Sequence, residues 1–95
     1  IDDYSKAINL QPDLYQALYN RANINIKLYN YSDAIRDYTM ALNQNPEFEE
    51  AYFNRGLTYI YMSDTLKACA DFSKSGELGN KDSYKLIKKF CSSHK

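Results

Sequence analysis

The stretch IRDYTMALNQNP (residues 35–46) repeats the opening stretch IDDYSKAINLQP (residues 1–12) at an offset of 34 residues. The identical positions include Ile1 and Ile35, Asp3 and Asp37, Tyr4 and Tyr38, Ala7 and Ala41, and Pro12 and Pro46. The aspartate and the aromatic residue return once more as Asp71 and Phe72. A fixed period of this length predicts stacked structural repeats, in which each unit covers the apolar face of its neighbour. Such a stack offers an extended surface, so the pattern favours recognition over catalysis.

Six helices are expected, separated by prolines, glycines and short polar turns. Apolar residues at helical spacing predict helices over 1–11, 14–28, 32–44, 48–62, 65–77 and 82–92. Pro12 and Pro46 end two of them, because the residue before a proline avoids helical backbone angles. Asp13 and Asp64 are placed to cap the helices that follow. Short connections favour antiparallel neighbours and no β alternation is present, so the sequence predicts an all-α fold.

Composition restricts the function classes without selecting one. The 95 residues suit one domain, and the formal net charge of zero indicates neither a nucleic acid nor a membrane as partner. Residues 1–80 carry 7 basic and 11 acidic side chains, whereas residues 81–95 carry 5 lysines and 1 aspartate. No apolar run approaches the ~18 residues of a membrane-spanning helix. The chain begins inside a repeat, so we expect it to be a segment of a longer protein.

Catalytic and metal-binding patterns are not recognisable in the sequence. It contains no Ser/His/Asp set, no paired-carboxylate pocket and no Gly-rich phosphate loop, so we expect a non-catalytic protein without a cofactor or metal. Cys69 and Cys91 match no zinc spacing and are too few for a disulfide framework. We therefore expect two reduced, packed thiols. The compartment is left open, with the cytoplasm favoured.

The repeated pattern resembles the tetratricopeptide repeat, a helix–turn–helix unit of 34 residues. The matching positions are Ala34, Tyr38, Ala41 and Pro46 in one motif, and Tyr52, Gly56, Tyr59, Ala68 and Phe72 in the next. The resemblance implies a right-handed α-solenoid of antiparallel helix pairs. Its units are the second half of a truncated repeat (1–12), two full repeats (13–46 and 47–80), and a capping helix with a tail (81–95).

Several positions depart from the family pattern. Arg21 and Arg55 stand where the motif prefers leucine, and a charge at an inward position needs a partner. The repeated aspartates are the candidates: Asp3 or Asp37 for Arg21, and Asp37 or Asp71 for Arg55. Tyr29 and Ser63 replace the usual turn glycine, which predicts looser turns.

The resemblance implies a protein or peptide ligand bound in a concave groove, and it implies a scaffold or adaptor role. Alignment with the family motif selects the groove residues Tyr19, Asn20, Asn23, Lys27, Phe53, Asn54, Leu57 and Tyr61. One alternative is a co-chaperone that clamps carboxylate-ended peptides, although Lys27 is the clear cation of this face and Glu50 opposes it. Another is single-stranded RNA binding, which the acidic balance of residues 1–80 disfavours.

The first predicted helix lacks the helix that normally precedes it in a repeat. Ile1, Tyr4 and Ile8 therefore form an uncovered apolar patch. We expect this patch to favour self-association, and we expect neither nucleic-acid binding nor insertion into a membrane.

Overall fold

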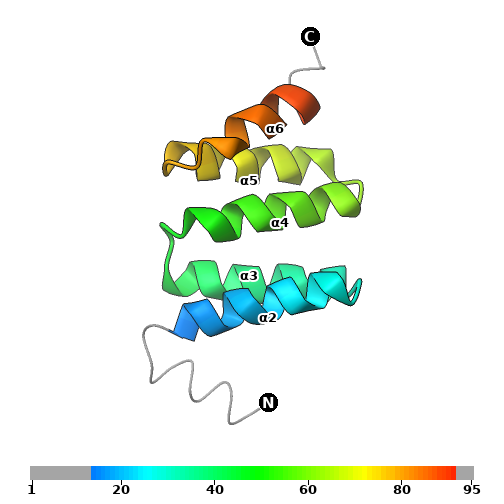
Figure 1. Cartoon of the computed structure of the whole chain (residues 1–95), viewed down its shortest axis with the longest axis vertical. Helices are drawn as coiled ribbons and strands as arrows, with labels where there is room; N and C mark the ends of the chain where they lie inside the picture. Colours follow the sequence, from blue (N-terminus) through cyan, green and yellow to red (C-terminus); the bar gives the residue numbers. More distant parts are fainter. Residues whose placement is uncertain (1–13, 92–95) are drawn as a thin grey trace.

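The computed structural model describes residues 14–91, which form a stack of helices (Figure 1). The helices are α2 (Tyr15–Lys27), α3 (Tyr31–Gln44), α4 (Glu49–Tyr61), α5 (Thr65–Glu77) and α6 (Asp82–Phe90). No strand occurs in this part of the chain, so the all-α prediction is confirmed. The helix predicted over 1–11, with Ile1, Asp3, Tyr4 and Ile8, lies outside the described residues, as does Asp13.

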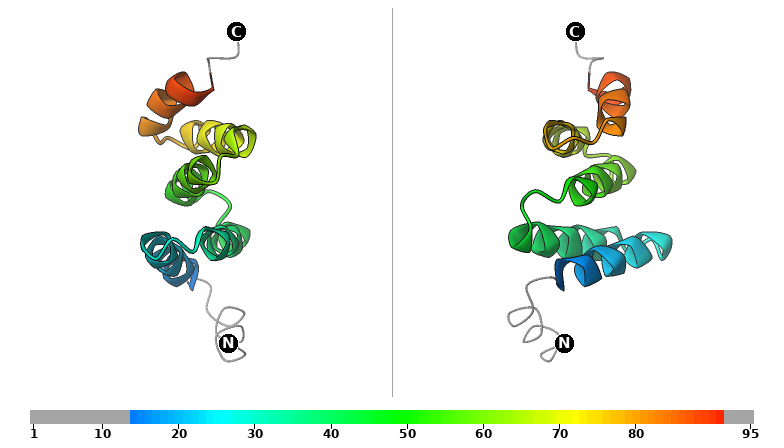
Figure 2. Two further views of the ribbon diagram at one scale, coloured as in Figure 1. Left: turned by 90° about the vertical axis from the view of Figure 1, so that its right-hand side faces the viewer. Right: turned by 60° about the vertical axis from the view of Figure 1, so that its left-hand side comes forward.

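The helices form two antiparallel pairs, α2 with α3 and α4 with α5, and α6 lies against α5. Figure 2 shows the same order from two further sides: the α2–α3 pair, then α4 and α5, then α6 at the end of the stack. Helix α3 contacts α4, and α2 also contacts α4. The first helices of the two pairs are therefore close enough to share a surface.

Small residues let the helices of each pair approach closely. Ala22 of α2 and Ala34 of α3 are fully buried, and Tyr38 is buried beside them in the same core. In the second pair a Cβ atom built on Gly56 would lie only 2.6 Å from Cε1 of Phe72. The side chain of Phe72 thus occupies the space that a larger residue at position 56 would need.

Three helices end in the same left-handed turn. Tyr29 has φ 62°, Ser63 has φ 63° and Gly79 has φ 112°. At each turn the N–H of this residue and the N–H of the next one donate to carbonyls of the preceding helix, which is the Schellman arrangement. The expectation of looser turns at Tyr29 and Ser63 is wrong, because the backbone keeps both hydrogen bonds without a glycine.

The cap predicted at Asp64 is confirmed. Its carboxylate accepts a hydrogen bond from the N–H of Lys67 at 3.3 Å, in the first turn of α5. Such a bond satisfies one of the N–H groups that have no partner within the helix.

The two cysteines form a disulfide bond, which contradicts the expected free thiols. Cys69 lies in α5 and Cys91 follows α6 directly. Because α6 packs along α5, the Cα atoms of these residues lie 5.9 Å apart although they are 22 positions apart in sequence. Within residues 14–91, no helix combines the length and the apolar character needed to span a bilayer.

Candidate functional site

Each of the two helix pairs is held together by one arginine–aspartate ion pair. Arg21 donates to both carboxylate oxygens of Asp37, at 2.8 Å from Nε and 2.6 Å from Nη2. Arg55 donates to both oxygens of Asp71, each at 2.8 Å. The forked geometry makes these charge-assisted bonds strong and directional. Each ion pair therefore fixes the first helix of a helix pair against the second. Asp3, the other candidate partner of Arg21, lies outside the described part.

Arg55 also connects the two helix pairs. Its Nη1 donates to the hydroxyl of Thr39 in α3 at 3.0 Å. The hydrogen bond to Asp71 raises the pKa of Arg55 above its ordinary value, although partial burial opposes the rise. This arginine stays charged and fixes α4 against both α5 and α3.

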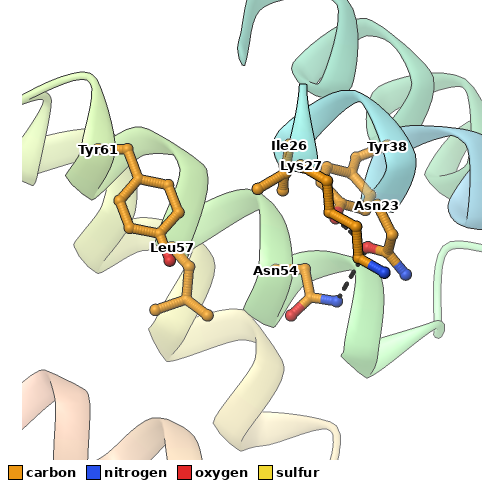
Figure 3. A pocket seen from close by; sticks show the side chains of 7 residues that line it. All are labelled: Asn23, Ile26, Lys27, Tyr38, Asn54, Leu57 and Tyr61. Atoms are coloured by element: carbon orange, nitrogen blue, oxygen red, sulfur yellow. Dashed lines mark hydrogen bonds between the residues drawn. The ribbon is translucent and has the colours of Figure 1, made fainter. Parts of the chain in front are cut away.

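A hollow of about 210 Å³ opens between α2 and α4 (Figure 3). Its lining combines amide, ammonium, phenol and aliphatic groups, from Asn23, Ile26, Lys27, Tyr38, Asn54, Leu57 and Tyr61. Five of these belong to the predicted groove. Ile26 and Tyr38 were not predicted to line it.

Hydrogen bonds fix the polar side of the hollow. The hydroxyl of Tyr38 donates to Oδ1 of Asn23, and Nδ2 of Asn54 donates to the same oxygen at 3.4 Å and to the hydroxyl of Tyr19 at 2.8 Å. Burial raises the pKa of Tyr38 and that of Tyr19, so both phenols stay protonated. The amide oxygen of Asn54 accepts no hydrogen bond from residues 14–91, and it points to the Leu57 side of the hollow (Figure 3).

The apolar side of the hollow leads to a row of aromatic rings. Tyr61 is 54% exposed and its ring lies 5.5 Å from that of Tyr31, which in turn lies 6.3 Å from the ring of Tyr29. Exposed Leu28 and Met62 follow α2 and α4 directly, at the turns that end these helices. A ligand that leaves the hollow past Tyr61 would meet apolar surface.

Charges of both signs lie near the hollow. Lys27 closes the C-terminal end of α2, and no carboxylate of residues 14–91 lies within ion-pair distance of it. Glu50 and Glu49, in the first turn of α4, add to the effect of burial in raising the pKa of Tyr19. Lys27 is thus an available cation of the lining, and the two carboxylates lie on the Tyr19 side, outside the lining.

Three predicted groove residues do not line the hollow. Asn20 is exposed on α2, and Tyr19 lies behind Asn54 as its hydrogen-bond partner. Phe53 packs its ring 6.0 Å from that of Phe72. Tyr38 was missed because its motif position is a core position. The available clue was its hydroxyl, which Phe72 lacks one repeat later.

No cluster of metal-ligating side chains occurs within the described part of the chain.

Residues 15–48 match the family model described as Tetratricopeptide repeat. A comparison with curated proteins gives no match. The matched segment spans the α2–α3 pair and the link to α4, and the second pair repeats its ion pair, its turn and its small-residue packing. Proteins of this family generally serve as non-catalytic modules for protein–protein interaction. The α2–α3 pair is thus a tetratricopeptide repeat, and a second helix pair with the same ion pair and turn is stacked on it.

Proposed function

We propose that the chain binds an extended segment of a partner protein in the hollow between α2 and α4. The observation that supports this most directly is the state of Asn54. Its NH2 group is held by Tyr19 and Asn23, which leaves its oxygen oriented and available. An amide oxygen fixed in this way is a ready acceptor for a backbone N–H of a bound peptide.

The lining also suggests which peptide would fit. Ile26 and Leu57 are half-buried and offer apolar contact to one aliphatic or aromatic side chain. Lys27 would pair with a carboxylate, and the acidic first turn of α4 would favour a positive group at the opposite end. We therefore expect a ligand with a basic or N-terminal end toward Glu50 and an acidic end toward Lys27.

A peptide that ends in a free carboxylate is the second candidate, favoured by the same Lys27. A chain terminus differs from an internal acidic residue in one respect that an experiment can use. Amidation removes the charge of a terminal carboxylate and leaves an internal aspartate or glutamate unchanged. A peptide pair that differs only in this way separates the two candidates.

The test is selection of short random peptides on the oxidised chain, followed by titration of the selected peptides by fluorescence anisotropy. Asn54→Ala should weaken binding by about tenfold, the loss expected for one oriented hydrogen bond in a desolvated site. Asn20→Ala is the matched control, because Asn20 holds the same motif position but is exposed and outside the hollow. Equal losses for the two variants would contradict the proposal. So would binding that survives Asn54→Ala but is abolished by charge reversal at Lys85 and Lys89.

A further inference from the structure

We propose that the Cys69–Cys91 disulfide is a redox latch that holds α6 on α5. When a dithiol reduces it, α6 is released while α2 to α5 stay folded. This inference does not depend on the peptide site, which lies on α2 and α4. It rests on how α6 is attached to the rest of the stack.

Helix α6 is too short and too little buried to hold its place alone. It spans 9 residues, and isolated helices of this length are unstable in water. Ser83 is its one buried residue, and the hydroxyl of Ser83 has no hydrogen-bond partner in residues 14–91. Its apolar residues Leu86, Ile87 and Phe90 are only half-buried. The helix therefore contributes no apolar side chain to a fully buried core.

Hydrogen bonds hold the beginning of α6 in place. Asn80 donates to the carboxylate of Glu49 at 3.0 Å and accepts from the N–H of Asp82 at 3.0 Å. The hydroxyl of Tyr84 donates to the carbonyl of Gly76 at 3.0 Å, and the ring of Tyr84 lies against this glycine. Cys91, which follows the end of α6 directly, adds a covalent bond to Cys69 of α5.

The position of Cys69 in the repeat supports the same conclusion. Cys69 lies 34 residues after Ile35, so an apolar side chain occupies this place in the first pair. Another helix pair follows α3, whereas α6 alone follows α5 in the described part. At this place α5 is joined to the following helix by a covalent bond, whereas the aliphatic Ile35 can offer only noncovalent packing.

Reduction is a two-electron exchange with a dithiol. A thiolate of the dithiol attacks one cysteine sulfur, forms a mixed disulfide and displaces the other sulfur as a thiolate. The second thiol of the reagent then displaces the first cysteine and closes a cyclic disulfide. The dithiol loses two electrons and two protons, and Cys69 and Cys91 gain them as two thiols. Both cysteine residues are only half-buried, so they are not sealed inside the core.

Release would change what the end of the stack presents. The face of α5 that carries Gly76 is now covered, because Gly76 is buried and the ring of Tyr84 lies against it. With α6 displaced, this face would become the open end of a helical array, onto which another helix can stack. The latch thus couples the redox environment to the length and exposure of the stack.

The experiment is hydrogen exchange of the whole chain, first oxidised and then reduced with dithiothreitol, read by mass spectrometry. Peptides covering α6 should exchange at least about tenfold faster after reduction, and those from α2 to α4 should not change. In Cys91→Ser, α6 should exchange fast without reductant, and dithiothreitol should not change its exchange rate.

Three outcomes would overturn the latch. The first is equal α6 protection in the oxidised chain, the reduced chain and Cys91→Ser. The second is loss of protection throughout α2 to α5, which would make the bond a support of the whole fold. The third is that the chain keeps two alkylatable thiols after incubation with oxidised glutathione, since the bond would then not form.

Discussion

The helix pairs α2–α3 and α4–α5 carry the same arginine–aspartate ion pair, but they bury it to different depths. The side chain of Arg21 is 41% exposed, whereas that of Arg55 is 19% exposed. Arg55 also donates to Thr39 of the preceding pair. The residue equivalent to Thr39 one repeat earlier is Ser5, outside the described residues. Arg55 therefore joins α4 to α5 within one helix pair, and it also joins this pair to the preceding one.

A second difference concerns the polarity of the two pairs. Tyr38 bonds Asn23 in the first pair, and the equivalent positions in the second pair are Phe72 and Leu57. The hydroxyl and the amide are thus present together in one unit and absent together in the other. The hollow therefore combines the Tyr38–Asn23 hydrogen bond of the first unit with Leu57, the apolar equivalent of Asn23 in the second unit.

Removing the aspartate should have the largest effect, and it should differ between the pairs. Asp71→Ala leaves Arg55 mostly buried without its carboxylate, so we expect the free energy of unfolding to fall by about 3 kcal/mol. Asp37→Ala should cost about 2 kcal/mol, because the more exposed Arg21 can be hydrated. Urea denaturation followed by circular dichroism measures both losses.

The control for this comparison is Asp33→Ala. Asp33 pairs with Arg36 at 3.4 Å on the exposed surface, and such pairs contribute at most about 1 kcal/mol. If Asp37→Ala lowered the free energy of unfolding more than Asp71→Ala, the burial of the arginine would not determine the loss of stability.

The next effect concerns the close contact between α4 and α5. Gly56→Ala should destabilise by about 2 kcal/mol, because its methyl group would meet the buried ring of Phe72, which Phe53 also contacts. The first pair already has an alanine, Ala22, at the equivalent position. Ala22→Gly should therefore cost only about 1 kcal/mol, mainly through helix propensity. Thermal melts of both variants test this, and an unchanged melt of Gly56→Ala would contradict the close packing.

Periodicity predicted the helices well because it reports on contacts that recur in each repeat. The bounds of α5 agree with the predicted 65–77, and α3 begins at Tyr31, one residue earlier than expected. The disulfide was missed because Cys69 and Cys91 belong to a contact at the end of the stack that has no counterpart 34 residues earlier. Asn20 and Asn54 share a motif position but differ in surroundings, since α2 lies beside Asn54. A single repeat cannot show which neighbour a side chain will meet.

Stability at alkaline pH should depend on Tyr38 of the first helix pair, whose equivalent in the second pair is Phe72. Burial raises the pKa of Tyr38, so above about pH 10 the unfolded chain releases a proton that the folded chain retains. The free energy of unfolding should therefore fall with rising pH, by up to about 1.4 kcal/mol per pH unit from this group. Tyr38→Phe should be less stable than the wild type near neutral pH, and the gap should narrow above about pH 10.

Asn23→Leu is the control for this titration. It removes the same hydrogen bond and reproduces Leu57 of the second pair, but it keeps the tyrosine. Its stability should fall with pH as that of the wild type does, measured as urea midpoints across the alkaline range. A gap between wild type and Tyr38→Phe that stays constant would show that Tyr38 ionises alike in both states.

The smallest expected change in stability concerns the turns that follow α2 and α4. There Tyr29 and Ser63 adopt a left-handed backbone conformation that favours glycine. Left-handed backbone costs a residue with a Cβ atom about 1 kcal/mol more than glycine. Ser63→Gly should thus raise the free energy of unfolding by about 0.5–1 kcal/mol. Tyr29→Gly should gain less, because it also loses the ring contact of Tyr29 with Tyr31. Gly79→Ala is the reverse change at the third turn and should destabilise, although a Cβ there meets open space. Thermal melts of the three variants should therefore rank Ser63→Gly first and Gly79→Ala last, and a destabilised Ser63→Gly would mean that its side chain holds the turn.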